Sequence, residues 1–126
     1  MFGFIRGRIA SFRPAFAGLF YVLRTQPNAW LHAVITLTVL AISFWVQIER
    51  TDWALILLTT ALVWLAEFFN TAVEVVIDLV TVEEHPLAKI GKDIGAGAVV
   101  IAAAIAVIVG LLVLGPPVLE RLRFGM

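Results

Sequence analysis

Three long apolar stretches dominate this sequence. They cover residues 29–48, 53–66 and 94–115, and His32 is their only ionisable side chain. About 20 residues at a helical rise of 1.5 Å cross a hydrocarbon core of roughly 30 Å, and a polar-striped extension gives the middle stretch that length. Hydrophobic side chains make up 62% of the 126 residues, whereas a globular domain has roughly half. The sequence therefore predicts an all-α membrane protein with three spanning helices.

We expect one membrane-embedded domain over residues 1–126. Its expected elements are an interfacial helix at 1–26 and spanning helices at 29–48, 53–80 and 87–115, the last closed by Pro116 and Pro117. The first helix carries an apolar stripe with arginines beside it, as helices at a membrane surface do. Ser11 and Pro14 place the start of its regular part near residue 12. The stripe consists of Ile5, Ile9, Phe12, Phe16, Leu19, Phe20 and Leu23.

Charge and composition exclude several classes of protein. Nine basic residues balance nine acidic ones, and no basic run or zinc-type cluster favours nucleic acid as a partner. The absence of cysteine excludes disulfides and thiol chemistry. Four arginines precede the first span and two lysines follow the second, against three basic residues in the other loop and tail. We therefore expect a multi-pass membrane protein with its N-terminus and second loop in the cytoplasm.

The most informative polar residues recur at helical spacing in the second span. Glu67, Asn70, Glu74 and Asp78 occupy an arc of about 80° on one helix face, and apolar side chains cover the rest. A carboxylate facing lipid costs a few kcal/mol, so this row must face protein or a polar cavity. Carboxylates are the oxygen ligands that Mg²⁺ prefers, and a desolvated one is a good general base. A polar seam between helices is the structural alternative.

Cations follow this row directly along the chain. Lys89, Lys92 and Asp93 lie at the start of the third span, after the acidic, histidine-bearing segment Glu83-Glu84-His85. A lysine near a helix N-terminus suits a phosphate, because the ammonium and the positive end of the helix act together. We therefore interpret Lys92 as a phosphate-binding residue. Its ordinary alternative is a snorkelling lysine on the cytoplasmic side.

Two segments resemble those of a known family. The first runs Glu67-Phe-Phe-Asn70-Thr71-Ala72-Val-Glu74-Val-Val-Ile-Asp78 and is similar to E-x-x-N-T/S-A-I/V-E-x-x-x-D. The second begins after thirteen further residues, runs Lys92-Asp93-Ile94-Gly95-Ala96-Gly97-Ala98, and is similar to K-D-x-A/G-A/S-A/G-A. The likeness continues upstream through Ser11-Phe12, Ala15, Gly18 and Gln26-Pro-Asn28-x-x-x-His32. The chain resembles the small prokaryotic lipid kinases, the diacylglycerol kinase and undecaprenol kinase family.

This resemblance implies a homotrimer that transfers the γ-phosphate of MgATP to a membrane lipid hydroxyl at the cytoplasmic interface. Glu67 would accept the hydroxyl proton, Glu74 would bind Mg²⁺, and Lys92 with Asp93 would bind the nucleotide. By the same resemblance, Asn70 and Asp78 would orient their neighbours. The remaining residues that it places near nucleotide or lipid are Glu83, Glu84, His85, Arg8, Asn28 and Ala96.

The chain departs from the family pattern at two places. Gln26 replaces a glutamate that helps to hold the metal in many members, so an uncharged carbonyl oxygen stands there. The nucleotide-binding arginine of some members falls on Gly7, and Arg6 and Arg8 flank it. Asn28 and His32 resemble the undecaprenol-type branch more than the diacylglycerol-type branch.

Two other classes of function compete with a lipid kinase. In a small oligomeric transporter or channel, the carboxylate row would line a cation path, and its charges should lie near the bilayer midplane. Here they cluster toward the cytoplasmic end, beside a lysine suited to phosphate. A purely structural subunit would leave three aligned carboxylates without a purpose. The sequence therefore favours the kinase.

Overall fold

The computed structural model describes residues 2–125, with side chains from residue 12 onward. The described chain consists of helices joined by short connections, which confirms the predicted all-α class. Three of the helices are long and apolar enough to cross a membrane, as the apolar stretches predicted. The four helices are α1 (Phe2–Thr25), α2 (Pro27–Val46), α3 (Arg50–Val80) and α4 (Pro86–Phe124).

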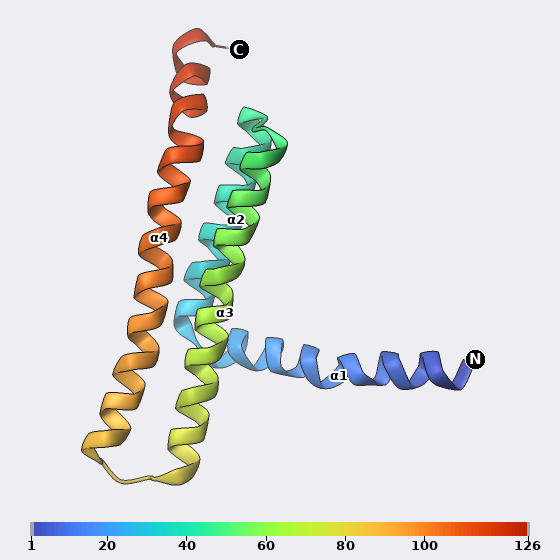
Figure 1. Ribbon diagram of the computed structural model, residues 1–126, viewed down its shortest axis with the longest axis vertical. Coiled ribbons are helices and arrows are strands. Elements are labelled where there is room, and N and C mark those ends of the chain that lie inside the picture. The colour runs from blue at the N-terminus through green and yellow to red at the C-terminus, as the bar shows by residue number, and fades with distance from the viewer. Residues whose placement is uncertain (1, 126) are drawn as a thin grey trace.

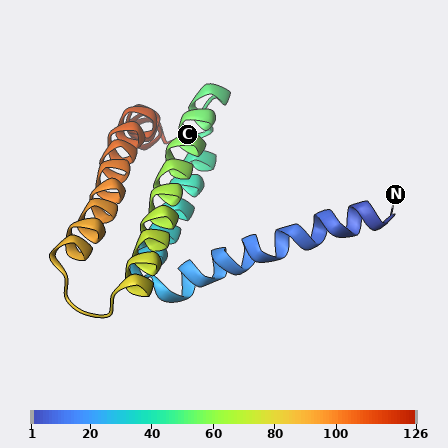
Figure 2. The ribbon, with the colours of Figure 1, turned by 60° about the horizontal axis from the view of Figure 1, so that its bottom comes forward.

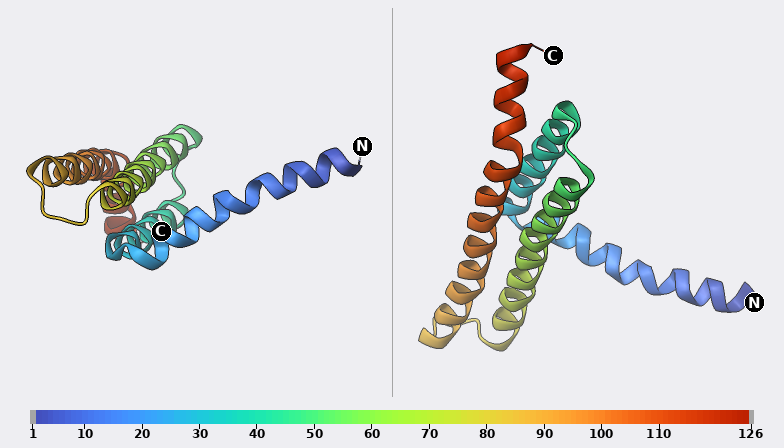
Figure 3. Two further views of the ribbon diagram at one scale, coloured as in Figure 1. Left: turned by 90° about the horizontal axis from the view of Figure 1, so that it is seen from below. Right: turned by 45° about the horizontal axis from the view of Figure 1, so that its top comes forward.

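The three long apolar helices run side by side, and α1 leaves them crosswise (Figure 1, Figure 2). The ends of α3 and α4, with the loop between them, extend beyond the level at which α1 departs (Figure 1, Figure 3). A helix crosswise to a spanning bundle can lie along the membrane surface, which is the placement predicted for the N-terminal segment. The α3–α4 loop then projects past that surface.

Large apolar side chains cover the outward faces of the bundle. Leu37 and Phe44 on α2 are well exposed, as is Leu111 on α4, while the buried core is small. In water such surfaces would be unfavourable, but hydrocarbon solvates them, and a helix satisfies its own backbone hydrogen bonds there. The buried apolar residues are Val22, Ala29, Ile56, Val63 and Leu114.

Several helix ends differ from those expected. The first helix begins at Phe2 rather than near residue 12, and Pro14 lies inside it although a proline removes one backbone hydrogen bond there. The first span covers 27–46 rather than 29–48, since Pro27 opens α2 and Gln47 ends it with a left-handed φ of 56°. The second begins at Arg50 rather than residue 53.

The third span was predicted to end at Pro116-Pro117, and this is wrong. Helix α4 begins at Pro86 and continues through both prolines to Phe124, where Gly125 caps it with a φ of 61°. The Arg121 guanidinium lies 6.0 Å from the centre of the Trp45 ring, so the added turns contact α2. Such tertiary contact offsets the lost backbone hydrogen bonds, as in other membrane helices that contain proline.

Helices α3 and α4 share the most extensive contact in the bundle. Glycines on α4 make this close approach possible. A Cβ atom at Gly95 would collide with Asn70 Oδ1, and one at Gly91 would lie 2.8 Å from Ile77 Cδ1. Gly97 lies two residues further along α4, and a Cβ atom added there would meet no other atom within 4 Å. The small-residue pattern of this segment therefore serves helix packing at Gly91 and Gly95.

We predict that Gly95→Val destabilises the protein more than Gly97→Val does. Both changes alter helix propensity equally, but only the first forces a methyl group against Asn70, and overpacking costs about 1–3 kcal/mol. Thermal unfolding in mild detergent measures the difference. Equal shifts of the midpoint for the two variants would contradict the close contact.

Candidate active site

Burial falls steadily along the polar row of α3. Glu67 is 1% exposed and Asn70 8%, Glu74 is half-buried, and the Asp78 side chain is 64% exposed. The row therefore leads from the interior of the bundle to the end that projects beyond α1. All four residues predicted from helical spacing to share one face belong to this single helix.

Glu67 is enclosed where α2 begins to pack on α3. Within the described part of the chain, neither of its carboxylate oxygens has a hydrogen-bond partner. The nearest ionisable group is His32 on α2, whose Nε2 lies 3.6 Å from Glu67 Oε2, beyond hydrogen-bonding distance. The ring of Trp64 meets His32 edge-on. A carboxylate with unused lone pairs in an apolar enclosure has the setting of a general base.

Two amides hold the Glu74 carboxylate one to two turns away. Asn70 Nδ2 donates to Glu74 Oε1 at 3.1 Å, and Gln26 Nε2 donates to Glu74 Oε2 at 3.2 Å. Gln26 occupies the N-cap position of α2, so the α1–α2 connection brings it against α3. Asn70 Oδ1 is buried and has no partner among the described residues. This arrangement joins Gln26 with Asn70 and Glu74 through their amide nitrogens.

The groups around Glu74 include oxygen atoms of the kind that a hard divalent cation takes. Both amides turn their NH₂ groups toward the carboxylate here, so the amide oxygens of Gln26 and Asn70 would face a cation at Glu74 only after the amides rotate. No three histidine, cysteine, aspartate or glutamate side chains in the described chain gather as a ready metal cage. A cation at this single carboxylate would therefore need further oxygen ligands from its own partners or from water.

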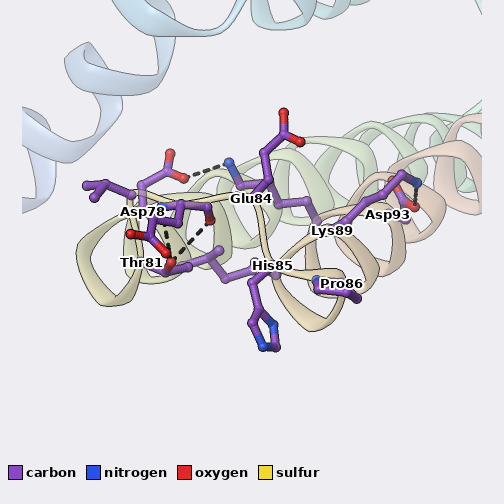
Figure 4. A pocket seen from close by; sticks show the side chains of 12 residues that line it. Asp78, Thr81, Glu84, His85, Pro86, Lys89 and Asp93 are labelled. Carbon is purple, nitrogen blue, oxygen red and sulfur yellow. Dashed lines mark hydrogen bonds and ion pairs between the residues drawn. The ribbon is translucent and has the colours of Figure 1, made fainter.

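Charged residues surround a cleft of about 920 Å³ where α3 and α4 end. Lys92 Nζ donates to Asp78 Oδ1 at 2.6 Å across the two helices, and Lys89 Nζ donates to Asp93 Oδ2 at 2.5 Å along α4. Figure 4 shows Asp78, Lys89 and Asp93 around the cleft, with the His85 ring directed away from Asp78. His85 Nδ1 accepts from the backbone N–H of Leu87 and so caps α4.

Several predicted residues stand apart from these contacts. Glu83 and Glu84 line the cleft and are exposed, whereas Asn28 and Ala96 are exposed on their helices. The side chain of Arg8 lies outside the described residues. Lys92, interpreted from the sequence as a phosphate ligand, has a carboxylate as its partner here.

Sequence reasoning assigned no site role to His32. The available signal was that it is the one ionisable residue within the apolar stretches. The role of His32 depends on which residue of the next span it faces. The structure places His32 beside Glu67.

We predict that Asp78→Asn leaves the thermal unfolding midpoint in detergent nearly unchanged. The ion pair with Lys92 is largely exposed, and such pairs contribute little net stability. Asp93→Asn, which breaks the pair within α4, is the matched control. A large drop for Asp78→Asn alone would show that this pair ties α3 to α4.

A family match and several individual relatives all point to one protein family. The family described as prokaryotic diacylglycerol kinase matches residues 13–114. A diacylglycerol kinase of Synechocystis sp. is 43% identical over 113 residues, which cover 89% of this chain and 65% of that relative. An undecaprenol kinase of Bacillus subtilis is 40% identical over 106 residues, which cover 84% of this chain and 86% of that relative. A diacylglycerol kinase of Escherichia coli is 35% identical over 75 residues, which cover 60% of this chain and 62% of that relative.

The chain thus spans slightly less than two thirds of the Synechocystis and Escherichia coli relatives and most of the Bacillus subtilis one. The family match covers both polar segments, on α3 and α4, and all but the last turns of the bundle. This chain belongs to the prokaryotic diacylglycerol kinase family.

Proposed function

We propose that this protein is a lipid kinase that transfers the γ-phosphoryl group of ATP, with Mg²⁺, to the hydroxyl of a membrane lipid. The observation that carries the proposal is the graded row on α3. It runs from Glu67, buried at the apolar end, to Asp78 beside a lysine-bearing cleft. A lipid kinase must join a reactant in the bilayer to a charged reactant from water. The names of the relatives support the same activity.

Each half of the row has its own role in this proposal. Glu67 accepts the proton of the lipid hydroxyl, while Glu74 and Gln26 would hold the magnesium ion and Asn70 would orient Glu74. When bound, this ion neutralises phosphate charge during transfer. Lys92 binds phosphate after leaving Asp78, a weak exposed partner. Catalysis then rests mainly on positioning and charge neutralisation.

The cleft at the ends of α3 and α4 is the proposed nucleotide site. Its volume of about 920 Å³ lies within the range of ordinary small-molecule pockets. Lys92 and Asp93 supply its charged contacts, and Asp78 orients Lys92 in the resting state. The other proposed nucleotide contacts are Glu83, Glu84, His85 and Arg8.

We place the protein in the bacterial inner membrane as one multi-pass domain over residues 1–126, with the N-terminus and the α3–α4 loop in the cytoplasm. The proposed assembly is a homotrimer. Asn28 and Ala96 are the proposed further lipid contacts, together with Glu67. The names of the relatives include both diacylglycerol and undecaprenol as substrates, so both lipids belong in the assay.

We predict that the purified protein transfers label from γ-labelled MgATP to undecaprenol or diacylglycerol, and that Glu67→Gln lowers kcat at least about 100-fold. Glutamine keeps the shape of the side chain but cannot take the hydroxyl proton, and general base catalysis contributes about this much. Nucleotide affinity, measured by calorimetry, should remain unchanged.

Glu49→Gln is the matched control, since Glu49 is an exposed residue at the opposite end of the same helix. Failure of the folded wild type to label either lipid would overturn the kinase. A cation flux in vesicles that requires Glu67 would instead support a transporter.

We predict that Gln26→Glu lowers the Mg²⁺ concentration for half-maximal activity about tenfold. A second carboxylate beside Glu74 adds ligand charge, which strengthens binding of divalent cations. Without Mg²⁺ the two carboxylates repel, so the variant should unfold at a lower temperature and recover when the ion is added. Gln47→Glu, at the other end of α2, controls for charge. Unchanged Mg²⁺ dependence would remove Gln26 from the metal site.

A further inference from the structure

His32 is a buried polar group that the proposed machinery leaves unused. Its side chain is 12% exposed, and Nε2 has no hydrogen-bond partner among the described residues. Glu67, 3.6 Å away, also lacks partners for both carboxylate oxygens. Two such groups side by side in an apolar bundle are costly unless they serve a reactant.

A second cavity, of about 530 Å³ and here called the apolar cleft, has His32 in its wall. It lies between α2, α3 and α4, and Ala103, Ala106 and Gly110 form part of its α4 wall. Among the described residues that line it, His32 is the only ionisable one, and Glu67 is not among them. His32 therefore stands between the apolar cleft and the buried carboxylate.

The lining of the apolar cleft favours a lipid chain as its occupant. Its walls are almost entirely apolar along α2, α3 and α4, and its one ionisable lining residue, His32, lies against a buried carboxylate. An apolar pocket with a single placed polar group suits a ligand that is a hydrocarbon chain with one polar end. A lipid chain in this cleft would bring its hydroxyl to His32, the ionisable group at its boundary.

We propose that the apolar cleft binds the hydrocarbon chain of the lipid substrate and that His32 relays the hydroxyl proton to Glu67. This rests on the proposed kinase function and adds a catalytic residue to it. Apo distances between catalytic groups are often long and tighten in the substrate complex, which is consistent with the 3.6 Å separation.

The proposed relay moves one proton from the lipid hydroxyl through His32 to Glu67. The lipid O–H bond breaks as His32 Nδ1 takes the proton, and His32 Nε2–H gives its own proton to Glu67 Oε2. The imidazole stays neutral in its other tautomer, and Glu67 becomes a carboxylic acid. The lipid oxygen bonds to the γ-phosphorus as the bond from that phosphorus to the ADP oxygen breaks. ADP leaves with those electrons. Glu67 later returns its proton to His32 Nε2, and His32 Nδ1–H gives its proton to water once the product has left.

His32→Ala and His32→Gln test the relay. We expect each to lower kcat about 100-fold while KM for MgATP stays constant, and free imidazole to restore part of the His32→Ala rate. Glutamine can donate to Glu67 but cannot carry a proton through. A His32→Gln enzyme with the wild-type rate would therefore overturn the relay. Should His32→Ala not fold, His32→Gln decides the question alone.

Val34→Ala is the matched control, because Val34 lies on the same helix, is exposed, and does not line the apolar cleft. The outcomes also separate this relay from the proposed function. A wild type that labels no lipid contradicts the kinase itself. A wild type that labels lipid as fast as both His32 variants contradicts only the relay.

Ala106→Phe tests the apolar cleft as the lipid site. The larger side chain should raise KM for the lipid about tenfold and leave nucleotide affinity unchanged. Ala104→Phe is the control, since Ala104 is an exposed residue of α4 outside the cleft. An unchanged KM, or a changed oligomeric mass for Ala106→Phe alone, would show that lipid does not occupy this cleft.

Discussion

The burial of the Glu67 carboxylate is the constraint on which the rest of the site depends. A charge at this depth must be shielded from hydrocarbon. The first turns of α2 provide that shield, with Ala29 fully buried and His32 against the carboxylate. This fixes where α2 starts relative to α3. It also brings the α2 N-cap, Gln26, to Glu74.

Close contact between α3 and α4 brings together the residues at the solvent-exposed end of the polar row. Gly95 lets the α4 backbone approach Asn70, and the two helix ends then lie near enough for Lys92 to reach Asp78. The cleft is lined by the ends of these two helices, which extend beyond the level of α1 (Figure 1). One pair of helices thereby carries both the apolar and the aqueous end of the polar row.

The sequence predicted what helix geometry alone determines. Apolar length gave three spans, because hydrocarbon forces a chain to satisfy its backbone hydrogen bonds internally. The spacing of Glu67 and Asp78 gave one polar face. Partners on other helices could not be predicted, since the facing of His32 and Lys92 depends on how the helices pack. The end of α4 was missed because Pro116 and Pro117 break helices in water but are tolerated in a packed apolar helix.

The two ends of the polar row differ in how readily their partners can be exchanged. At the aqueous end, Asp78 and Lys92 form an exposed ion pair, so water can replace either partner, and phosphate can replace Asp78, at small cost. At the apolar end, Glu67 is almost fully buried, so a proton taken from a substrate must reach it through a neighbouring side chain or a side chain that moves. The proposed lipid kinase needs this asymmetry. In the proposed reaction, the nucleotide end opens and closes in each cycle, whereas the lipid end keeps water away from the phosphoryl group.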